Sequence, residues 1–227
     1  MIEATYVDHM GSDLSVVNAA RVSFGKKSEL ECIDMVKGVY VMAHKDTKLI
    51  QYLAKHKHMS PFGHAFATFH VKAPIFVARQ LVKHKFLRWN EISRRYVDER
   101  PEFYEPDVWR GRAENKKQGS SGKISVEHSD FYVTDLGDDG TLGDAAFFIY
   151  KSLLEKGVCP EQARMVLPQS TMTEWYWSGS LDAFSDMCLL RCASDTQVET
   201  QEVANQISHK MHELFPVSWM VLAKGRG

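Results

Sequence analysis

A stretch of basic side chains at residues 79–96 carries the strongest chemical signal in this sequence. It holds six Lys or Arg residues, His84 and a single carboxylate, although the 227-residue chain has a formal net charge of only -1. Such a local excess of positive charge is typical of a site that binds an anion, because Lys and Arg donate charge-assisted hydrogen bonds to phosphates and carboxylates. If the segment is helical, Arg79 shares a stripe with Lys83, and Gln80 shares the neighbouring stripe with His84.

The order of residue types within this stretch is more specific than its charge. Lys83-His84-Lys85 is followed after seven residues by Ser93, with Asn90-Glu91 before the serine and Arg95-Tyr96 after it. This order resembles the signature of the flavin-dependent thymidylate synthases, and the preceding residues 72–80 are similar to that family as well. The likeness extends over residues 2–24, 45–104 and 144–205.

Two further segments resemble substrate-binding elements of the same family. One is Glu161-Gln162-Ala163-Arg164, and the other is Leu189-Leu190-Arg191. The chain also departs from the family pattern. Lys83 and Lys85 stand where the family usually has Arg, and lysine keeps the charge without the planar fork that binds a phosphate through two parallel hydrogen bonds. Other departures are Arg88 for a small residue and Ser180, Asp182, Asp186 and Asp195 for Asn, Arg, Asn and His.

The resemblance implies an enzyme that reductively methylates dUMP to dTMP. Methylenetetrahydrofolate would give the carbon, NADPH would be the reductant, FAD would carry the hydride, and the sites would lie between subunits of a homotetramer. The residues then expected to bind dUMP are Gln80, Lys83, Glu91, Ser93, Arg94, Arg95, Arg164 and Arg191. The residues expected near FAD are Ser23, His58, Ser60, Lys83, His84, Lys85, Glu91 and Asp186. Arg191 is the expected catalytic residue, because its cation would stabilise negative charge developing on the uracil ring.

Other interpretations of the same residues stay open. The basic segment alone also fits a solvated helix face, or a module that binds single-stranded nucleic acid by pairing phosphates and stacking bases on Phe86, Trp89 and Tyr96. The enzyme interpretation predicts no nucleic-acid partner. His64 and His70 share strand parity, but no carboxylate lies nearby at ligand spacing, so no metal site is expected. No strand is followed by Gly-x-Gly-x-x-Gly, so FAD is not expected on a Rossmann turn.

The elements that position these residues can be predicted from periodicity, proline and glycine. Strands are expected over 2–8, 64–72 and 169–178, and a turn over 60–64. Helices are expected after an N-cap at Asp13 or Ser15, over 45–57, from Pro74 through the basic segment, from Asp144 to Gly157, after Pro160, over 181–193 and over 196–214. The glycine-rich residues 111–143 predict a long flexible insertion, in which only Phe131–Val133 is a candidate strand.

Composition places the chain among ordinary globular proteins. At 25.9 kDa, with 44% hydrophobic and 25% charged residues, it predicts a single α+β domain over 1–227, with helices packed around a modest, mainly antiparallel sheet. The sequence lacks an apolar run of membrane length or an export signal, so a cytoplasmic protein without a membrane partner is expected. Four scattered cysteines predict reduced thiols.

Overall fold

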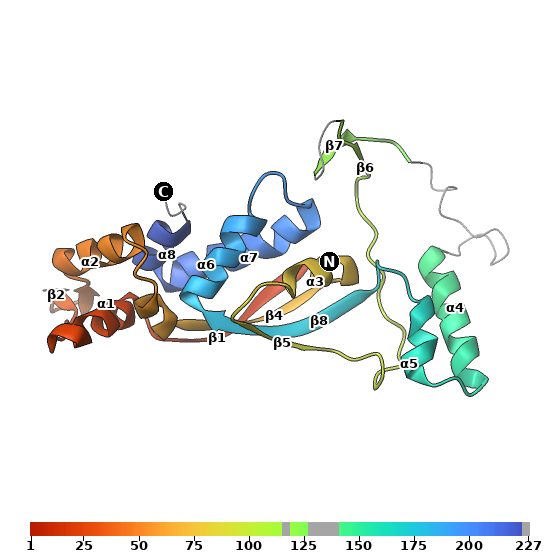
Figure 1. The fold of residues 1–227 in the computed structure, drawn as a ribbon, viewed down its shortest axis with the longest axis horizontal. Helices are drawn as coiled ribbons and strands as arrows, with labels where there is room; N and C mark the ends of the chain where they lie inside the picture. The colour runs from red at the N-terminus through yellow and green to blue at the C-terminus, as the bar shows by residue number, and fades with distance from the viewer. Residues whose placement is uncertain (115–118, 127–140, 224–227) are drawn as a thin grey trace.

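A computed structural model describes residues 1–114, 119–126 and 141–223 of the chain (Figure 1). The first half contains β1 (Glu3–Met10), α1 (Asp13–Arg21), β2 (Glu31–Asp34), β3 (Val39–Val41), α2 (His44–Lys55), β4 (Phe66–Pro74), α3 (Ile75–Leu81) and β5 (Leu87–Glu91). The second half contains β6 (Arg110–Arg112), β7 (Ser120–Lys123), α4 (Leu142–Glu155), α5 (Pro160–Ala163), β8 (Met172–Ser180), α6 (Leu181–Arg191), α7 (Val198–Leu214) and α8 (Pro216–Ala223).

A four-stranded antiparallel sheet with the order β1-β4-β8-β5 forms the centre of the fold. β4 and β8 pair along their whole length, from Phe66 opposite Ser180 to Pro74 opposite Met172. Alternate residues of β4 are buried, as expected for a strand whose one face packs on a core. The predicted α+β class with a mainly antiparallel sheet is therefore confirmed.

Helices α3, α6 and α7 cover the buried face of this sheet (Figure 1). The core between them contains large side chains with almost no exposed surface, including Trp175 and Trp177 of β8, Phe69 of β4 and Phe184 of α6. Burial of such aromatic side chains is a major source of stability in a domain of this size. The opposite face of β4 carries half-buried polar residues, among them His70, whose Nε2 lies 3.2 Å from a carboxylate oxygen of Glu174.

The remaining helices lie at the two ends of an elongated molecule (Figure 1). At one end, α1, α2 and α8 pack together, and the buried Asp46 of α2 accepts hydrogen bonds from Arg21 and from Ser28. Asp13 begins α1 and also accepts hydrogen bonds from the backbone N–H groups of Val217 and Ser218 at the start of α8. At the other end, α4 and α5 pack against each other beyond the end of the sheet.

The structure corrects the prediction for the basic segment. α3 ends at Leu81, so Arg79/Lys83 and Gln80/His84 do not form helical pairs. The chain then turns through Phe86, whose φ of 64° is unusual for a side chain of this size, and continues as β5. Pairing with β8 explains why these residues form a strand and not a helix, because β5 is the edge strand of the sheet next to β8.

Other predicted elements are confirmed within a few residues, with three differences. Ser12 is the N-cap of α1, in place of Asp13 or Ser15, and His64 belongs to a 3-10 helix over Ser60–His64 instead of to β4. The β6–β7 hairpin lies in the segment predicted to be unstructured. The candidate strand Phe131–Val133 falls outside the described residues.

Candidate active site

Most of the predicted site residues line one of two cavities in the described part of the chain. The first, called here the arginine-lined cavity, has a volume of about 440 Å³. It is lined by Ile75, Glu91, Ile92, Ser93, Arg94, Arg95, Arg164, Leu167, Thr171, Met172 and Thr173. The second, called the Arg191 cavity, has a volume of about 820 Å³. Its lining includes Phe76, Gln80, Lys83, Tyr104, Trp109, Arg110, Arg191, Gln197 and Glu199.

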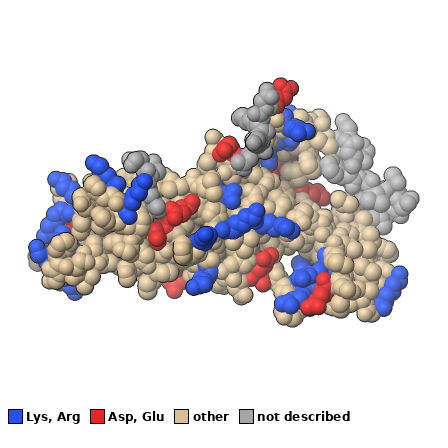
Figure 2. Space-filling view, in the orientation of Figure 1, with Lys and Arg blue, Asp and Glu red and all other residues tan. Residues whose placement is uncertain are grey.

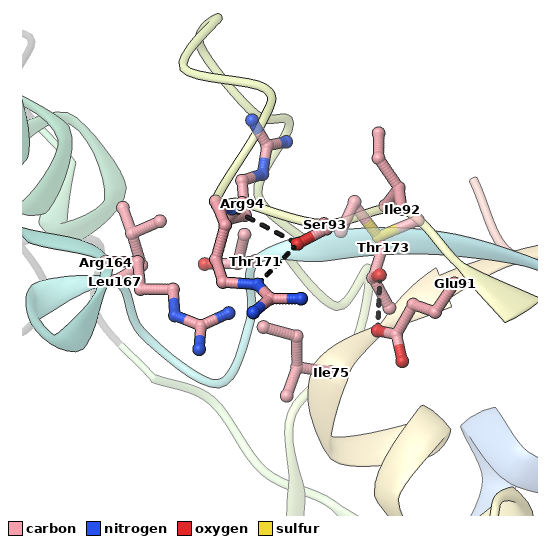
Figure 3. A pocket seen from close by; sticks show the side chains of 11 residues that line it. Ile75, Glu91, Ile92, Ser93, Arg94, Arg164, Leu167, Thr171 and Thr173 are labelled. Atoms are coloured by element: carbon pink, nitrogen blue, oxygen red, sulfur yellow. Dashed lines mark hydrogen bonds between the residues drawn. The ribbon is translucent and has the colours of Figure 1, made fainter. Parts of the chain in front are cut away.

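The arginine-lined cavity lies where the end of β5 and the loop after it face α5 and the start of β8 (Figure 3). The hydroxyl of Ser93 accepts hydrogen bonds from the backbone N–H and the Nε of Arg95, at 3.3 and 3.5 Å. The guanidinium of Arg164 extends toward the same space from the α5 side, and its Nε donates to the carbonyl of Glu161 at 3.3 Å. Both arginines are exposed, and Arg95 also lies 3.6 Å from a carboxylate oxygen of Glu161. Together with the Ser93 hydroxyl they form a donor set that suits a phosphate group.

Glu91 brings a negative charge into this otherwise cationic cavity. One carboxylate oxygen accepts a hydrogen bond from the Thr173 hydroxyl at 2.6 Å, which Figure 3 shows as a dashed line. The other oxygen accepts from the indole N–H of Trp89 at 3.0 Å. Arg94 has a structural part in the same loop, because its guanidinium donates to the carbonyl of Glu99 at 2.7 Å.

Arg191 is held at the C-terminal end of α6 by the turn that follows α3. Its Nε donates to Nε2 of His84 at 3.0 Å, and an Nη donates to the carbonyl of Gln80 at 3.2 Å. His84 can accept this hydrogen bond only when Nε2 carries no proton. Burial, together with the positive charge of Arg191, lowers the pKa of His84 from 6.5 to about 4. Burial also lowers the pKa of the Arg191 guanidinium from its ordinary value.

A buried carboxylate on α7 supports the outer wall of the Arg191 cavity. Glu199 forms an ion pair with Arg110 and accepts a hydrogen bond from the Tyr104 hydroxyl at 3.3 Å. Burial raises the pKa of Glu199, but the hydrogen bond and charge of Arg110, together with hydrogen bonds from the backbone and Gln197, outweigh burial, so the pKa is lowered overall. Burial and the charge of Glu199 raise the pKa of Tyr104 to about 12. The ion pair therefore fixes the start of β6 to α7.

The predicted dUMP-binding residues thus divide between the two cavities. Glu91, Ser93, Arg94, Arg95 and Arg164 line the first, whereas Gln80, Lys83 and Arg191 line the second.

The predicted cofactor residues spread more widely. His84 contacts Arg191, and Lys85 is exposed on the turn before β5. Ser23, His58, Ser60 and Asp186 are exposed and line neither cavity. Ser23, His58 and Ser60 follow α1 and α2, at the end of the molecule opposite α4 and α5 (Figure 1).

Sequence reasoning missed several residues that shape these cavities. Trp89 and Thr173 bond to Glu91, Gln197 accepts a hydrogen bond from Gln80 at 2.5 Å, and Glu199 holds Arg110. Their partners lie up to 117 residues away in the chain, so no local pattern reveals them. Only the contact between Trp89 and Glu91 could have been predicted from the sequence, because residues two positions apart on a strand lie on the same face.

Other features bear on the alternative interpretations. The ring of Trp89 stacks on that of Trp175 at a centroid distance of 4.2 Å, so this face of Trp89 is not available to a nucleic-acid base. Figure 2 shows Lys and Arg side chains interspersed with Asp and Glu on the visible face.

Across the described ranges, His, Cys, Asp and Glu side chains form no group of three or more that could hold a metal ion. In the same part of the chain, no helix has the length and apolar character needed to cross a membrane. The four cysteines are free, as predicted.

The helix-covered antiparallel sheet places the chain in the α+β class, and the arginines of the cavity at its edge suit an anion. Residues 5–217 match the family described as "Thymidylate synthase complementing protein". The flavin-dependent thymidylate synthase of Thermus thermophilus is 39% identical over 94% of this chain and 72% of its own length. That of Thermosipho africanus is 38% identical over 96% of this chain and 89% of its own length.

A solved structure shows the same architecture. The UMP/dUMP methylase PolB from Streptomyces cacaoi, bound with 5-Br dUMP, is 31% identical with a TM-score of 0.79, over 100% of this chain and 97% of that one. The chain belongs to the family of flavin-dependent thymidylate synthases and is an enzyme of that family. The resemblance in the basic segment is therefore confirmed.

Proposed function

We propose that this enzyme methylates dUMP to dTMP. The observation that carries the proposal is the combination of Arg95, Arg164, Ser93 and Glu91 in one cavity. Arginines and a hydroxyl suit the dianionic phosphate of a nucleotide, while a carboxylate accepts hydrogen bonds from a sugar hydroxyl or a ring N–H. The name of PolB, a UMP/dUMP methylase bound with 5-Br dUMP, supports the same substrate for a related fold.

The proposed cofactor is FAD, and the turn between α3 and β5 has the chemistry to hold part of it. Lys83 and Lys85 are exposed on this turn, and within the described residues neither ammonium group forms an ion pair. Two such cations suit a pyrophosphate. His58 is exposed and its ring lies 6.0 Å from that of Tyr52 at an interplanar angle of 29°, so two aromatic rings are grouped where a ring system could stack. Ser23, Ser60, His84, Glu91 and Asp186 complete the proposed set.

The protein's own contribution to the reaction is to bind and to polarise. When bound, the flavin would supply hydride, with NADPH as reductant and methylenetetrahydrofolate as carbon donor. Arg191 would direct its guanidinium at the uracil ring, where a fixed cation stabilises negative charge that develops as the ring is activated. The Gln80 carbonyl and His84 orient that guanidinium by accepting hydrogen bonds from it.

We propose further that each site is assembled between subunits of a homotetramer. The predicted dUMP-binding residues lie in two separate cavities of one chain, and the predicted flavin contacts near α1 and α2 lie far from α5. Bringing a cavity of one subunit against a cavity of another would complete the set. Equimolar mixing of Arg164→Ala and Arg191→Ala subunits tests this proposal. Activity should return on mixing if the two residues serve one site from different subunits, and should stay absent if they act within one chain.

The proposed reaction is tested by measuring dTMP formation with dUMP, methylenetetrahydrofolate, FAD and NADPH supplied together. We expect the purified protein to bind flavin, whose absorption NADPH should bleach. Arg191→Ala should abolish dTMP formation and leave the folded structure, measured by circular dichroism, intact. Unchanged turnover in Arg191→Ala would contradict the role given to this residue. A wild-type protein that forms no dTMP would contradict the proposed reaction itself.

A further inference from the structure

Glu91 is the one carboxylate in the lining of the arginine-lined cavity, and it does not pair with the cations there. Arg94, Arg95 and Arg164 line the same cavity, yet no ion pair joins any of them to Glu91 in the described part of the chain. Glu91 is exposed, and an unrestrained carboxylate whose side chain can reach an arginine is expected to turn toward it, because opposite charges attract. Something in the fold therefore keeps Glu91 separate.

Two hydrogen-bond donors account for this separation. Thr173 binds one carboxylate oxygen at 2.6 Å and Trp89 binds the other at 3.0 Å. With one donor on each oxygen, both the position and the plane of the carboxylate are fixed. Each oxygen still has a free lone pair, because a carboxylate has about four acceptor sites. Glu91 is thus oriented and remains able to accept a further hydrogen bond.

Both donors are themselves held in place by the central sheet. Trp89 stacks on Trp175 at 4.2 Å with an interplanar angle of 18°, and it meets Trp177 edge-on at 5.7 Å. Thr173 is a buried residue of β8, the strand that pairs with β5. Side chains fixed by core packing have few alternative rotamers, so they hold a partner more rigidly than surface side chains do.

We propose that Trp89 and Thr173 are positioning residues that orient Glu91 toward a hydrogen-bond donor of the nucleotide, either a sugar hydroxyl or a ring N–H. The proposal rests on the proposed dUMP-binding function of this cavity. By holding Glu91 away from the arginines, the two residues also keep a second carboxylate from competing for Arg95, which already lies 3.6 Å from Glu161. Neither residue touches the substrate in this account, because both act through Glu91.

The chain offers a closely matched test for the tryptophan. Trp89→Phe keeps an aromatic ring on Trp175 but removes the indole N–H that binds Glu91. Trp175→Phe is the control, because it alters the same stack while its own indole N–H is buried and has no hydrogen-bond partner among the described residues. Titration calorimetry with dUMP should give a dissociation constant about ten-fold higher for Trp89→Phe, the cost of losing one hydrogen bond to a charged group. Trp175→Phe should bind dUMP like the wild type to within about three-fold.

Thr173 provides an independent test with its own rescue. Thr173→Val keeps the side-chain shape and removes the hydroxyl, and it should weaken dUMP binding by about ten-fold. Thr173→Ser keeps the hydroxyl and should restore most of the affinity. Steady-state kinetics should place the effect of Trp89→Phe and Thr173→Val mainly in KM for dUMP, whereas a loss of folding would lower the active fraction and leave KM unchanged.

The outcomes separate this proposal from the proposed function. If wild-type protein binds dUMP but Trp89→Phe matches Trp175→Phe, or Thr173→Ser is as weak as Thr173→Val, the positioning role is wrong. If wild-type protein does not bind dUMP at all, the proposed substrate is wrong instead. If Glu91→Gln binds dUMP like the wild type, Glu91 makes no hydrogen bond that its partners need to orient, and the positioning role is again wrong.

Discussion

Protonation of His84 should weaken the packing of Arg191 and lower the stability of the protein at acidic pH. The Nε2 atom that accepts the 3.0 Å hydrogen bond from Arg191 is the atom that an added proton would occupy. Burial and the nearby Arg191 cation together lower the pKa of His84 from 6.5 to about 4. The unfolded chain, in which the ring is exposed, should keep the ordinary value.

The sign and size of the effect follow from these two pKa values. Between about pH 4 and pH 6.5 the unfolded chain binds a proton that the folded chain does not, so the free energy of unfolding should fall as the pH falls through this window. Above about pH 6.5 the ring is neutral in both states, so His84 should add nothing to the pH dependence of stability. The full difference corresponds to roughly 3 kcal/mol at about 1.4 kcal/mol per pH unit. Since the ring is only half-buried, solvent screens part of it, and about 1–2 kcal/mol remains.

Urea unfolding at a series of pH values from 4 to 7 measures this contribution. His84→Gln removes the titrating group, so its free energy of unfolding should depend less on pH than that of the wild type by about 1–2 kcal/mol over the window. His209→Gln is the control, because His209 has an 81% exposed side chain and does not contact Arg191. An NMR titration that gave His84 an ordinary pKa in the folded protein, or an unchanged pH dependence in His84→Gln, would refute the reasoning.

Three further changes have outcomes that can be measured directly. Glu199→Gln should lower the free energy of unfolding by about 1–3 kcal/mol, because it removes the charge that a partly buried Arg110 pairs with; urea unfolding at pH 7 measures it. Gly179→Ala should also destabilise, by about 1–3 kcal/mol, since the added Cβ would lie 2.3 Å from a methyl carbon of Leu87. An unchanged melting temperature would contradict this. Lys83→Arg should tighten FAD binding if Lys83 contacts the pyrophosphate, because the guanidinium fork can form two parallel hydrogen bonds; equal FAD affinity in Lys83→Gln would exclude that contact.

The sequence predicted the elements whose signals are local. The alternation in β4, the proline before α3 and the apolar periodicity of α2 each identify an element without knowledge of the rest of the chain. β5 was missed because its strand character comes from pairing with β8, which begins 81 residues after Glu91. A basic segment that looks helical by composition becomes a strand when a sheet edge is there to pair with it.

The same difference between local and distant signals applies to the candidate site. The residues of the family signature could be named from their order alone, whereas the partners that orient them could not. Glu91 was predicted as a binding residue, but its contact with Thr173 joins strands far apart in sequence. His84 was predicted near a cofactor, and only the structure reveals its hydrogen bond to Arg191, 107 residues away. Such contacts depend on tertiary packing, which no short motif encodes.

β5 also explains why one continuous signature lines two cavities. Gln80 and Lys83 precede this strand and face the Arg191 cavity, whereas Ser93 and Arg95 follow it and face the arginine-lined cavity. Five residues of extended chain, at about 3.3 Å each, separate the two halves by roughly 16 Å. This separation supports the proposal that the two halves serve sites shared between different subunits. In that case, substitutions before and after β5 should complement each other in mixed assemblies.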